Sequence, residues 1–191
     1  MKTKITKSVS ILTLLLIASL YGKAQSFTKD TKIISAGIGL GSSLWGTGGK
    51  GRPAISANFE KGAWELGDAG VVSLGGYIGN TGYKSTYKFG SYISEDKWSY
   101  TVIGARSAFH YSGLNNDVWD IYGGLMLSYN IASYSFKDND SSYDYDAGGA
   151  ASGLGFTGYV GGRYNFSEKL GAYAELGYGV SVLALGVSIK F

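Results

Sequence analysis

The sequence contains no cysteine, one proline (Pro53) and one histidine (His110) among its 191 residues. The absence of cysteine excludes disulfide bonds, a thiolate nucleophile and a lipid-modified N-terminal cysteine. Charged residues are also few, at 16% of the chain. So low a charge content does not provide the densely charged surface that is typical of a soluble domain.

Glycine and aromatic residues are abundant instead. The chain has 31 Gly, 16 Tyr, 8 Phe and 4 Trp. Glycine within a helix costs about 1 kcal/mol relative to alanine, so glycines spread through apolar stretches disfavour helices. This composition predicts an all-β protein.

Residues 1–24 have the features of an export signal. Lys2, Lys4 and Lys7 form a basic start, residues 9–20 are largely apolar, and small residues at 22–24 fit a cleavage site. The apolar run is shorter than the ~20 residues that a transmembrane helix needs. We therefore expect a signal peptide over residues 1–24 and one domain over residues 25–191.

Removal of this leader would reverse the sign of the net charge. The whole chain has 17 basic and 14 acidic residues, a net charge of +3, but Lys2, Lys4, Lys7 and Lys23 lie in the leader. Without the leader, 13 basic and 14 acidic residues remain, so residues 25–191 have a net charge of −1. Proteins that bind nucleic acids usually present a basic face, so no nucleic-acid partner is expected.

Eight segments alternate between apolar and small or polar residues, as strands do. Most have at least the ~9 to 11 residues that a tilted strand needs to cross a bilayer. The segments are residues 32–42, 53–61, 70–80, 97–111, 119–134, 154–166, 169–178 and 180–191.

The connections between these segments alternate in length. The set expected on the outward side is 43–52, 81–96, 135–153 and 177–179, and the set expected on the periplasmic side is 62–69, 112–118 and 167–168. Long outward loops and short inward turns are typical of outer-membrane barrels. The sequence therefore predicts an eight-stranded antiparallel up-and-down transmembrane β-barrel with both termini in the periplasm.

The two faces of the predicted strands differ in charge. One face has no charged residue and includes Ile34, Ile38, Ile55, Leu74, Ile103, Leu125, Phe156 and Leu176. The opposite face has many glycines and six charges that cancel: Glu60, Arg106, Asp120, Arg163, Glu175 and Lys190. A soluble lipocalin-like barrel shows the same alternation, so alternation alone does not decide which face points outward.

The tryptophans favour the membrane interpretation. Trp45 and Trp98 fall at the outward ends of segments, and Trp64 and Trp119 fall at the periplasmic ends. Aromatic girdles at both interfaces are typical of membrane barrels. The six charges would then lie inside, where eight strands leave room only for side chains, so we expect a structural plug. The alternative is a small conductive path lined by these charges.

The C-terminal stretch carries a family resemblance. Residues 163–179 (RYNFSEKLGAYAELGYG) and the final Ile189-Lys190-Phe191 resemble the small outer-membrane β-barrels of Bacteroidota, porin-like or OmpA/OmpX-type proteins. The resemblance implies an outer-membrane location, no shared catalytic residue, and a role for Phe191 in the signal read by the barrel-assembly machinery. Large OmpA proteins continue into a peptidoglycan-binding domain, whereas this chain ends on its eighth strand, so anchoring to the cell wall is not expected.

Two motifs have ordinary structural explanations. Residues 153–158 (GLGFTG) fit the dinucleotide pattern GxGxxG, but a strand rather than a helix follows them, so no cofactor is expected. His110 could serve as the base of a lipid A hydrolase. Its predicted place near the periplasmic end of the interior instead indicates a hydrogen-bonded structural histidine.

The third outward loop is rich in aspartate. Asp138, Asp140, Asp144 and Asp146 could hold Ca²⁺, but the glycine and bidentate glutamate of an EF-hand are missing. A solvated acidic loop without metal is therefore expected.

The outward loops also carry many aromatic residues, which are common at recognition surfaces. They are Tyr83, Tyr87, Phe89, Tyr92, Tyr143 and Tyr145. We expect a non-enzymatic, monomeric outer-membrane barrel with a structural or surface-interaction role. Its expected partners are membrane lipid, the assembly machinery and an unidentified envelope or surface protein. A small-solute pore is the alternative, and an envelope lipid hydrolase is less favoured.

Overall fold

The computed structural model describes residues 27–44, 49–114, 117–139, 145–148, 152–178 and 180–191. The predicted signal peptide lies outside these residues. The strands are β1 (Lys32–Leu40), β2 (Lys50–Glu65), β3 (Gly70–Phe89), β4 (Tyr92–Tyr111), β5 (Trp119–Asp138), β6 (Tyr145–Gly148), β7 (Gly153–Asn165), β8 (Leu170–Gly177) and β9 (Leu183–Lys190). A short 3-10 helix, η1 (Gly67–Ala69), joins β2 to β3. Among the described residues, no helix is long and apolar enough to span a bilayer.

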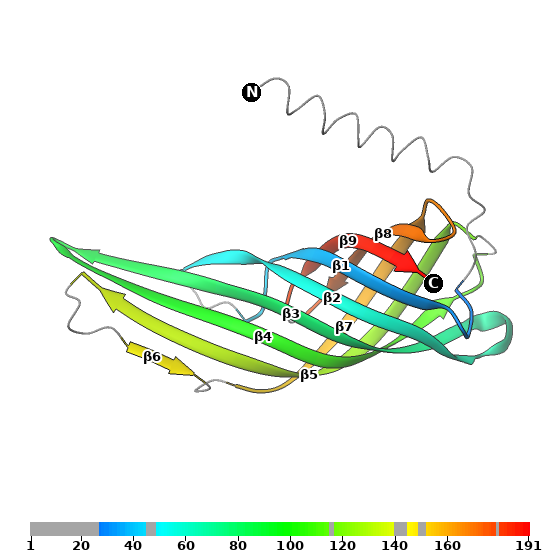
Figure 1. Cartoon of the computed structure of the whole chain (residues 1–191), viewed down its shortest axis with the longest axis horizontal. Coiled ribbons are helices and arrows are strands. Elements are labelled where there is room, and N and C mark those ends of the chain that lie inside the picture. The colour runs from blue at the N-terminus through cyan, green and yellow to red at the C-terminus, as the bar shows by residue number, and fades with distance from the viewer. Residues whose placement is uncertain (1–26, 45–48, 115–116, 140–144, 149–151, 179) are drawn as a thin grey trace, which may run out of the picture.

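Eight of the strands close into a ring (Figure 1). Each of the eight pairs with two antiparallel neighbours, and β1 joins the last strand through a register from Ile33 opposite Lys190 to Leu40 opposite Leu183. The remaining pairing, between β4 and β5, completes the circle, and β6 pairs with β5 outside it. The predicted eight-stranded antiparallel barrel is confirmed. Closure gives the C-terminal strand a partner on each side, so no edge is left open in the ring.

The apolar face of the strands forms the outside of the barrel. Ile38, Ile103 and Leu127 are 57%, 52% and 60% exposed. The opposite face of the same strands is buried and polar, with Ser35, Ser73 and Ser188 at 3% exposure or less. We call these the outer face and the inner face. Burying polar groups while exposing large aliphatic ones reverses the arrangement of a soluble protein.

Glycines on the inner face make room for large rings. A Cβ at Gly124 would lie 2.5 Å from the hydroxyl of Tyr159, and one at Gly161 would lie 2.7 Å from the ring of Tyr122. The interior of an eight-stranded barrel is just wide enough for its side chains, so each tyrosine requires a missing side chain opposite it.

The four strands from β2 to β5 continue beyond the ring (Figure 1). The last rungs that close the ring on this side are Gly39 opposite Ala54 and Asn130 opposite Gly153. We call the parts beyond them, residues 50–52, 81–100 and 131–138, the extension. The C-terminus lies at the opposite end of the barrel (Figure 1).

The extension corrects two predicted loops. Residues 81–96 are strand apart from a tight turn at Gly90 and Ser91, with register from Thr81 opposite Tyr100 to Phe89 opposite Tyr92. In the predicted loop 135–153, β5 continues to Asp138 and β6 pairs back onto it. Apart from Ile93 and a few small residues, both faces of these segments are polar or aromatic, so they lack the apolar alternation that marks the other strands. Gly90 takes a positive φ of 58°, which glycine adopts without the penalty of a side chain.

The other boundaries differ from prediction by a few residues. β2 starts at Lys50 rather than at residue 53 and runs to Glu65, and β9 starts at Leu183 rather than at residue 180. The predicted connection over 112–118 lies between the observed ends of β4 and β5.

Candidate functional site

Five of the six predicted interior charges meet inside the ring. Glu60 comes from β2, Arg106 from β4, Asp120 from β5, Arg163 from β7 and Glu175 from β8. Each lies on the inner face because its position alternates with exposed apolar neighbours. Their side chains are between 1% and 13% exposed. Lys190, the sixth, is half-buried at the end of β9.

Glu60 links the two arginines. Arg106 Nη2 lies 3.0 Å from Glu60 Oε1 and donates to Glu175 Oε1 at 2.7 Å. Arg163 Nη1 donates to Asp120 Oδ2 at 2.5 Å, and its Nη2 lies 3.6 Å from Glu60 Oε2. Neither oxygen of Glu60 accepts a well-aligned hydrogen bond, so ion pairs alone compensate this buried carboxylate.

Tyrosines fill the space around these charges. Arg106 lies 4.2 Å from the ring centre of Tyr159, and Arg163 lies 5.1 Å from that of Tyr122. The Tyr122 hydroxyl donates to Glu175 Oε1 at 2.9 Å. The cavity that Arg106 and Glu175 line has a volume of about 40 Å³, room for only a few water molecules. This packing suits a plug.

His110 has the hydrogen bonds of a structural residue. Its Nδ1 lies 2.8 Å from Asp120 Oδ1, and its Nε2 lies 3.1 Å from Ser73 Oγ. Phe27 stacks on the imidazole, with ring centres 3.6 Å apart and planes within 1°. The hydrogen-bonded connection from Ser73 through His110 to Asp120 matches that of a hydrolase triad. Ser73 is 0% exposed, however, so a substrate cannot reach its hydroxyl in this structure.

The predicted interfacial tryptophans lie in different environments. Trp64 and Trp119 are 55% and 50% exposed on the outer face, at the end of the barrel opposite the extension. Trp98 lies on the inner face of the extension rather than on the outer wall, because it shares the alternation of Arg106 and His110. Trp45 lies outside the described residues.

The remaining predicted positions carry no cofactor or metal geometry. Residues 153–158 lie in β7, which continues as a strand to Asn165. Asp138 belongs to β5 and Asp146 to β6, whereas Asp140 and Asp144 lie outside the described residues. Within the described part of the chain, no three His, Cys, Asp or Glu side chains are grouped to hold a metal ion. Phe191 follows β9, is 60% exposed, and donates its N–H to the carbonyl of Lys32 at 3.0 Å.

The inner face of the extension carries an aromatic cluster that the sequence patterns did not reveal. Trp98 lies centrally: its ring plane is within 10° of that of Tyr83 and within 11° of that of Tyr100, both at 6.4 Å. Tyr134, directly opposite on β5, packs on it at 4.6 Å. We call these four residues the aromatic cluster. Alternating aromatics at 98, 100 and 134 are the available signal, but the sequence prediction assigns Trp98 and Tyr134 to strand ends.

An acidic residue borders the aromatic cluster. The hydroxyl of Tyr134 donates to Asp96 Oδ1 at 2.5 Å, and this hydrogen bond raises the pKa of Tyr134 to about 12. Asp96 therefore accepts from a neutral phenol at physiological pH. Flat rings can stack on the apolar face of a ligand, while the neighbouring carboxylate and hydroxyl groups accept hydrogen bonds from the same ligand.

Two solved structures are similar to the chain in fold. Both are of Ail, the attachment invasion locus protein of Yersinia pestis. The complex of Ail with the heparin analogue sucrose octasulfate is 12% identical, with 84% of this chain and 96% of Ail covered and a TM-score of 0.44. The other Ail structure is 13% identical, with 86% and 100% covered and a TM-score of 0.46. No protein-family model and no curated protein matches the chain.

Proposed function

We propose that this chain is an integral outer-membrane β-barrel with a structural and surface-recognition role, exerted through its extension. The observation that carries this proposal is the exposed apolar outer face around a sealed polar interior. Aliphatic side chains such as Ile55 (69% exposed) and Leu154 (79% exposed) cover a continuous wall, and a bilayer is the environment that stabilises such a wall. The basic leader and the aromatics Trp64 and Trp119 agree with export and membrane insertion.

Membrane insertion can be tested on the mature chain. Refolding into phosphatidylcholine vesicles should give a form that migrates differently in gels before and after boiling and that resists protease. Soluble, folded protein in the absence of detergent or lipid would contradict the proposal.

The recognition role is supported by the aromatic cluster and Asp96. Projecting rings in parallel planes offer a surface for the apolar faces of sugar rings or of peptide side chains. Because the interior below is filled, a ligand would bind on the extension rather than pass through the ring.

A binding screen with a matched control tests this role. The purified barrel should bind immobilised extracellular glycans or matrix proteins, and Trp98→Ala should weaken that binding at least tenfold. Trp64→Ala removes an equally large exposed ring at the opposite end and should leave binding unchanged. Equal losses in the two variants, or no binding by the parent protein to any probe, would refute recognition by the aromatic cluster.

The pore and hydrolase alternatives have direct tests. Single-channel recordings in planar bilayers should show no steady current, because Arg106, Glu60 and the tyrosines fill the interior. Overexpression should leave the mass of lipid A unchanged, and a shift that His110→Ala abolishes would establish an enzyme. Membership of the Bacteroidota barrels and a monomeric state also stay predictions. Detergent-corrected sedimentation can test the monomeric state.

A further inference from the structure

The outer face changes from apolar to cationic over four successive rows of the sheet, where β2 to β5 leave the ring. Residues in one row lie opposite one another on neighbouring strands. In order toward the extension, the rows are Ala57-Ile78-Ile103-Tyr129, Ile55-Asn80-Thr101-Ile131, Arg52-Gly82-Ser99-Ser133 and Lys50-Lys84-Lys97-Ser135. The apolar band therefore ends at the second row, and four cations occupy the two rows that follow.

The spacing of these rows matches the depth of a lipid headgroup layer. Same-face residues on a strand are about 6.7 Å apart, and barrel strands are tilted by ~35 to 45°, so successive same-face residues of one strand rise by roughly 5 Å. The headgroup region adds roughly 5 to 7 Å on each side of the hydrocarbon core. Long arginine and lysine side chains extend along such a boundary while their charged ends stay in the polar layer. The two cationic rows thus fall where headgroups lie if Ile55 and Ile131 face acyl chains.

The positive charge of these rows is largely uncompensated. Among the described residues, Arg52 hydrogen-bonds only neutral groups: Asn80 Oδ1, Ser99 Oγ at 3.3 Å and the carbonyl of Thr81 at 3.4 Å. Lys50 has no acidic partner among the described residues. Lys84 and Lys97 share a single carboxylate, that of Glu95, and remain 47% and 53% exposed.

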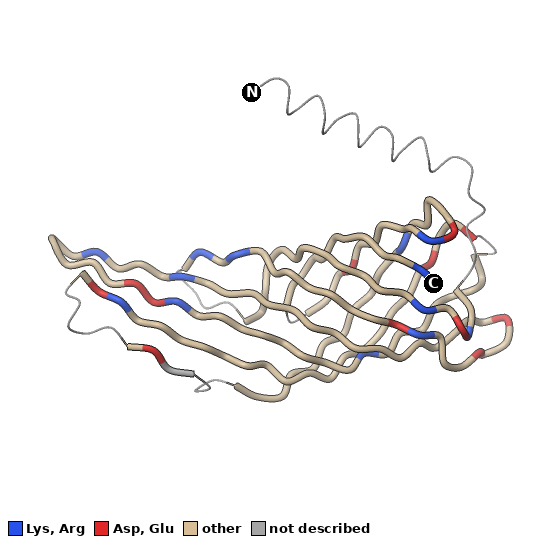
Figure 2. The backbone as a smooth tube through the Cα atoms, viewed as in Figure 1, with Lys and Arg blue, Asp and Glu red and all other residues tan. Residues whose placement is uncertain are grey.

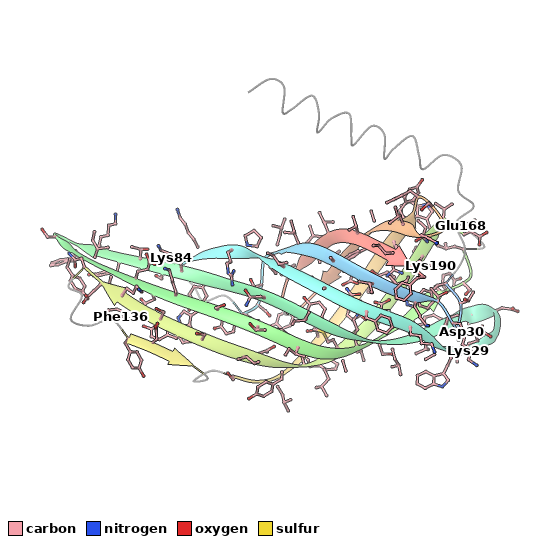
Figure 3. The ribbon with its side chains drawn as sticks, in the orientation of Figure 1. Lys29, Asp30, Lys84, Phe136, Glu168 and Lys190 are labelled. Atoms are coloured by element: carbon pink, nitrogen blue, oxygen red, sulfur yellow. The ribbon has the colours of Figure 1, made fainter. Side chains whose placement is uncertain are left out.

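Acidic residues border the patch without covering it. Asp146 lies opposite Ser135 and ends the lysine row on β6, and Asp96 and Asp138 alternate onto the inner face. Figure 2 shows basic residues gathered on the extension near the start of β2, and Figure 3 labels Lys84 there, far from Lys190 at the other end.

The four cations surround a shallow hollow with a volume of about 590 Å³. Gly51, Gly82, Ser99, Ser133 and Ser135 form part of its lining, together with Tyr83 and Trp98 of the aromatic cluster. A Cβ at Gly82 would lie 2.4 Å from the carbonyl oxygen of Trp98 and 3.1 Å from Arg52 Nε. The absence of a side chain at Gly82 leaves room for the Arg52 side chain, whose guanidinium donates to the hydroxyl of Ser99.

We propose that this hollow binds the phosphate groups of lipid headgroups in the leaflet next to the extension. Ammonium, guanidinium and hydroxyl donors are the groups that hold phosphate oxygens in proteins. Below the cations, Ile55 and Ile131 of the second row and Ile78 and Ile103 of the first row supply the surface for the acyl chains of the same lipid. A free phosphate ion would meet the cations but not this apolar surface, so a phosphorylated lipid is the occupant. The four cations lie on the outer face, whereas Tyr83 and Trp98, which also line the hollow, alternate onto the inner face.

Lipid binding to the purified barrel in dodecyl maltoside tests this proposal. Bisphosphorylated lipid A, titrated and measured by native mass spectrometry, should bind one-to-one in preference to the same lipid without phosphates. Lys50→Gln combined with Arg52→Gln should raise Kd about 25-fold, because each surface cation contributes about fivefold to anionic-lipid binding. Both side chains are exposed, and unchanged heat-modified gel mobility verifies that the variant folds.

Lys32 and Lys61 provide the matched control. They lie opposite each other on the outer face at the other end of the barrel, also exposed. Lys32→Gln combined with Lys61→Gln removes the same charge and should change Kd less than twofold. An equal loss in this control would show general charge attraction and overturn the site. Equal binding of the phosphate-free lipid, or competition by millimolar inorganic phosphate, would overturn the lipid assignment.

Discussion

The ring interior and the extension use the same kinds of residues in opposite ways. Inside the ring, Arg106 and Glu60 pair with side chains that are 2% and 1% exposed. On the extension, Lys84 and Glu95 pair with side chains that are 47% and 23% exposed. Buried pairs make each partner indispensable, because losing one leaves an uncompensated charge. Exposed pairs contribute about 0 to 1 kcal/mol, so the extension is free to use its charges for binding.

Removing an arginine from the interior should produce the largest change in stability. Arg163→Met removes the arginine partner of Asp120 and one of the two arginines beside Glu60, and should lower the free energy of unfolding by about 3 to 5 kcal/mol. Urea unfolding in detergent, followed by tryptophan fluorescence, measures this loss. Lys84→Met on the extension should cost less than about 1 kcal/mol. Similar losses in the two variants would remove the contrast between the regions.

A pair of adjacent glycines should sharpen the contrast between the two faces of the ring. A Cβ at Gly124 would lie 2.2 Å from the carbonyl oxygen of Ser107, whereas one at Gly123 would meet nothing closer than 3.6 Å. Gly124→Ala should therefore destabilise the barrel by about 1 to 3 kcal/mol, as overpacking does. Gly123→Ala should be close to neutral by the same unfolding measurement. A larger loss of stability in Gly123→Ala than in Gly124→Ala would show that the tight packing is not on the inner face.

Shortening the extension should leave the ring intact. Replacing residues 86–95 by Asn-Gly joins Ser85 to Asp96, which already lie opposite each other, through a two-residue hairpin turn. Because the eight-strand closure lies below this point, the free energy of unfolding should change by less than about 1 kcal/mol. Failure of the shortened chain to give the heat-modifiable form would show that the extension is needed for the barrel to fold.

The smallest effect should be a pH dependence confined to the extension. The ammonium groups of Lys84 and Lys97 hold the pKa of Glu95 below its ordinary value of 4.5. A carboxyl with a lowered folded-state pKa contributes stability above its unfolded-state pKa and loses that contribution as the pH falls through the folded value. The difference in free energy of unfolding between the parent chain and Glu95→Gln should therefore shrink as the pH falls below about 4.5. Carboxyl chemical shifts give the pKa, which should rise in Lys84→Gln combined with Lys97→Gln.

The ring could be predicted from the sequence because each of its strands has one exposed apolar face and one buried polar face. This arrangement imposes strict alternation, so Ile34, Ile103 and Leu125 indicated the outer face and Glu60 or Arg163 the inner one. The extension could not be recognised in this way, since both of its faces carry polar residues. Lys84, Thr86 and Lys88 alternate with Tyr83, Ser85 and Tyr87, and neither set is apolar.

The interior contacts also required the fold. Glu60, Arg106 and Glu175 are far apart along the chain, and only ring closure brings their strands round to a common centre. The sequence indicated that the interior charges balance but not which carboxylate pairs with which arginine. The sequence also did not indicate which residues form the aromatic cluster and the cationic rows, because both depend on register across β2 to β5.

By itself, the sequence determined the eight strands of the ring, their antiparallel order and the face of each that bears charge. These properties depend on residues two apart along one strand, and such spacing is visible in the chain. Only the tertiary structure decided the length of the extension, the partners of Glu60 and the cationic hollow beside Arg52. Those properties depend on which residues of neighbouring strands lie opposite each other, and backbone hydrogen bonding with ring closure sets that register.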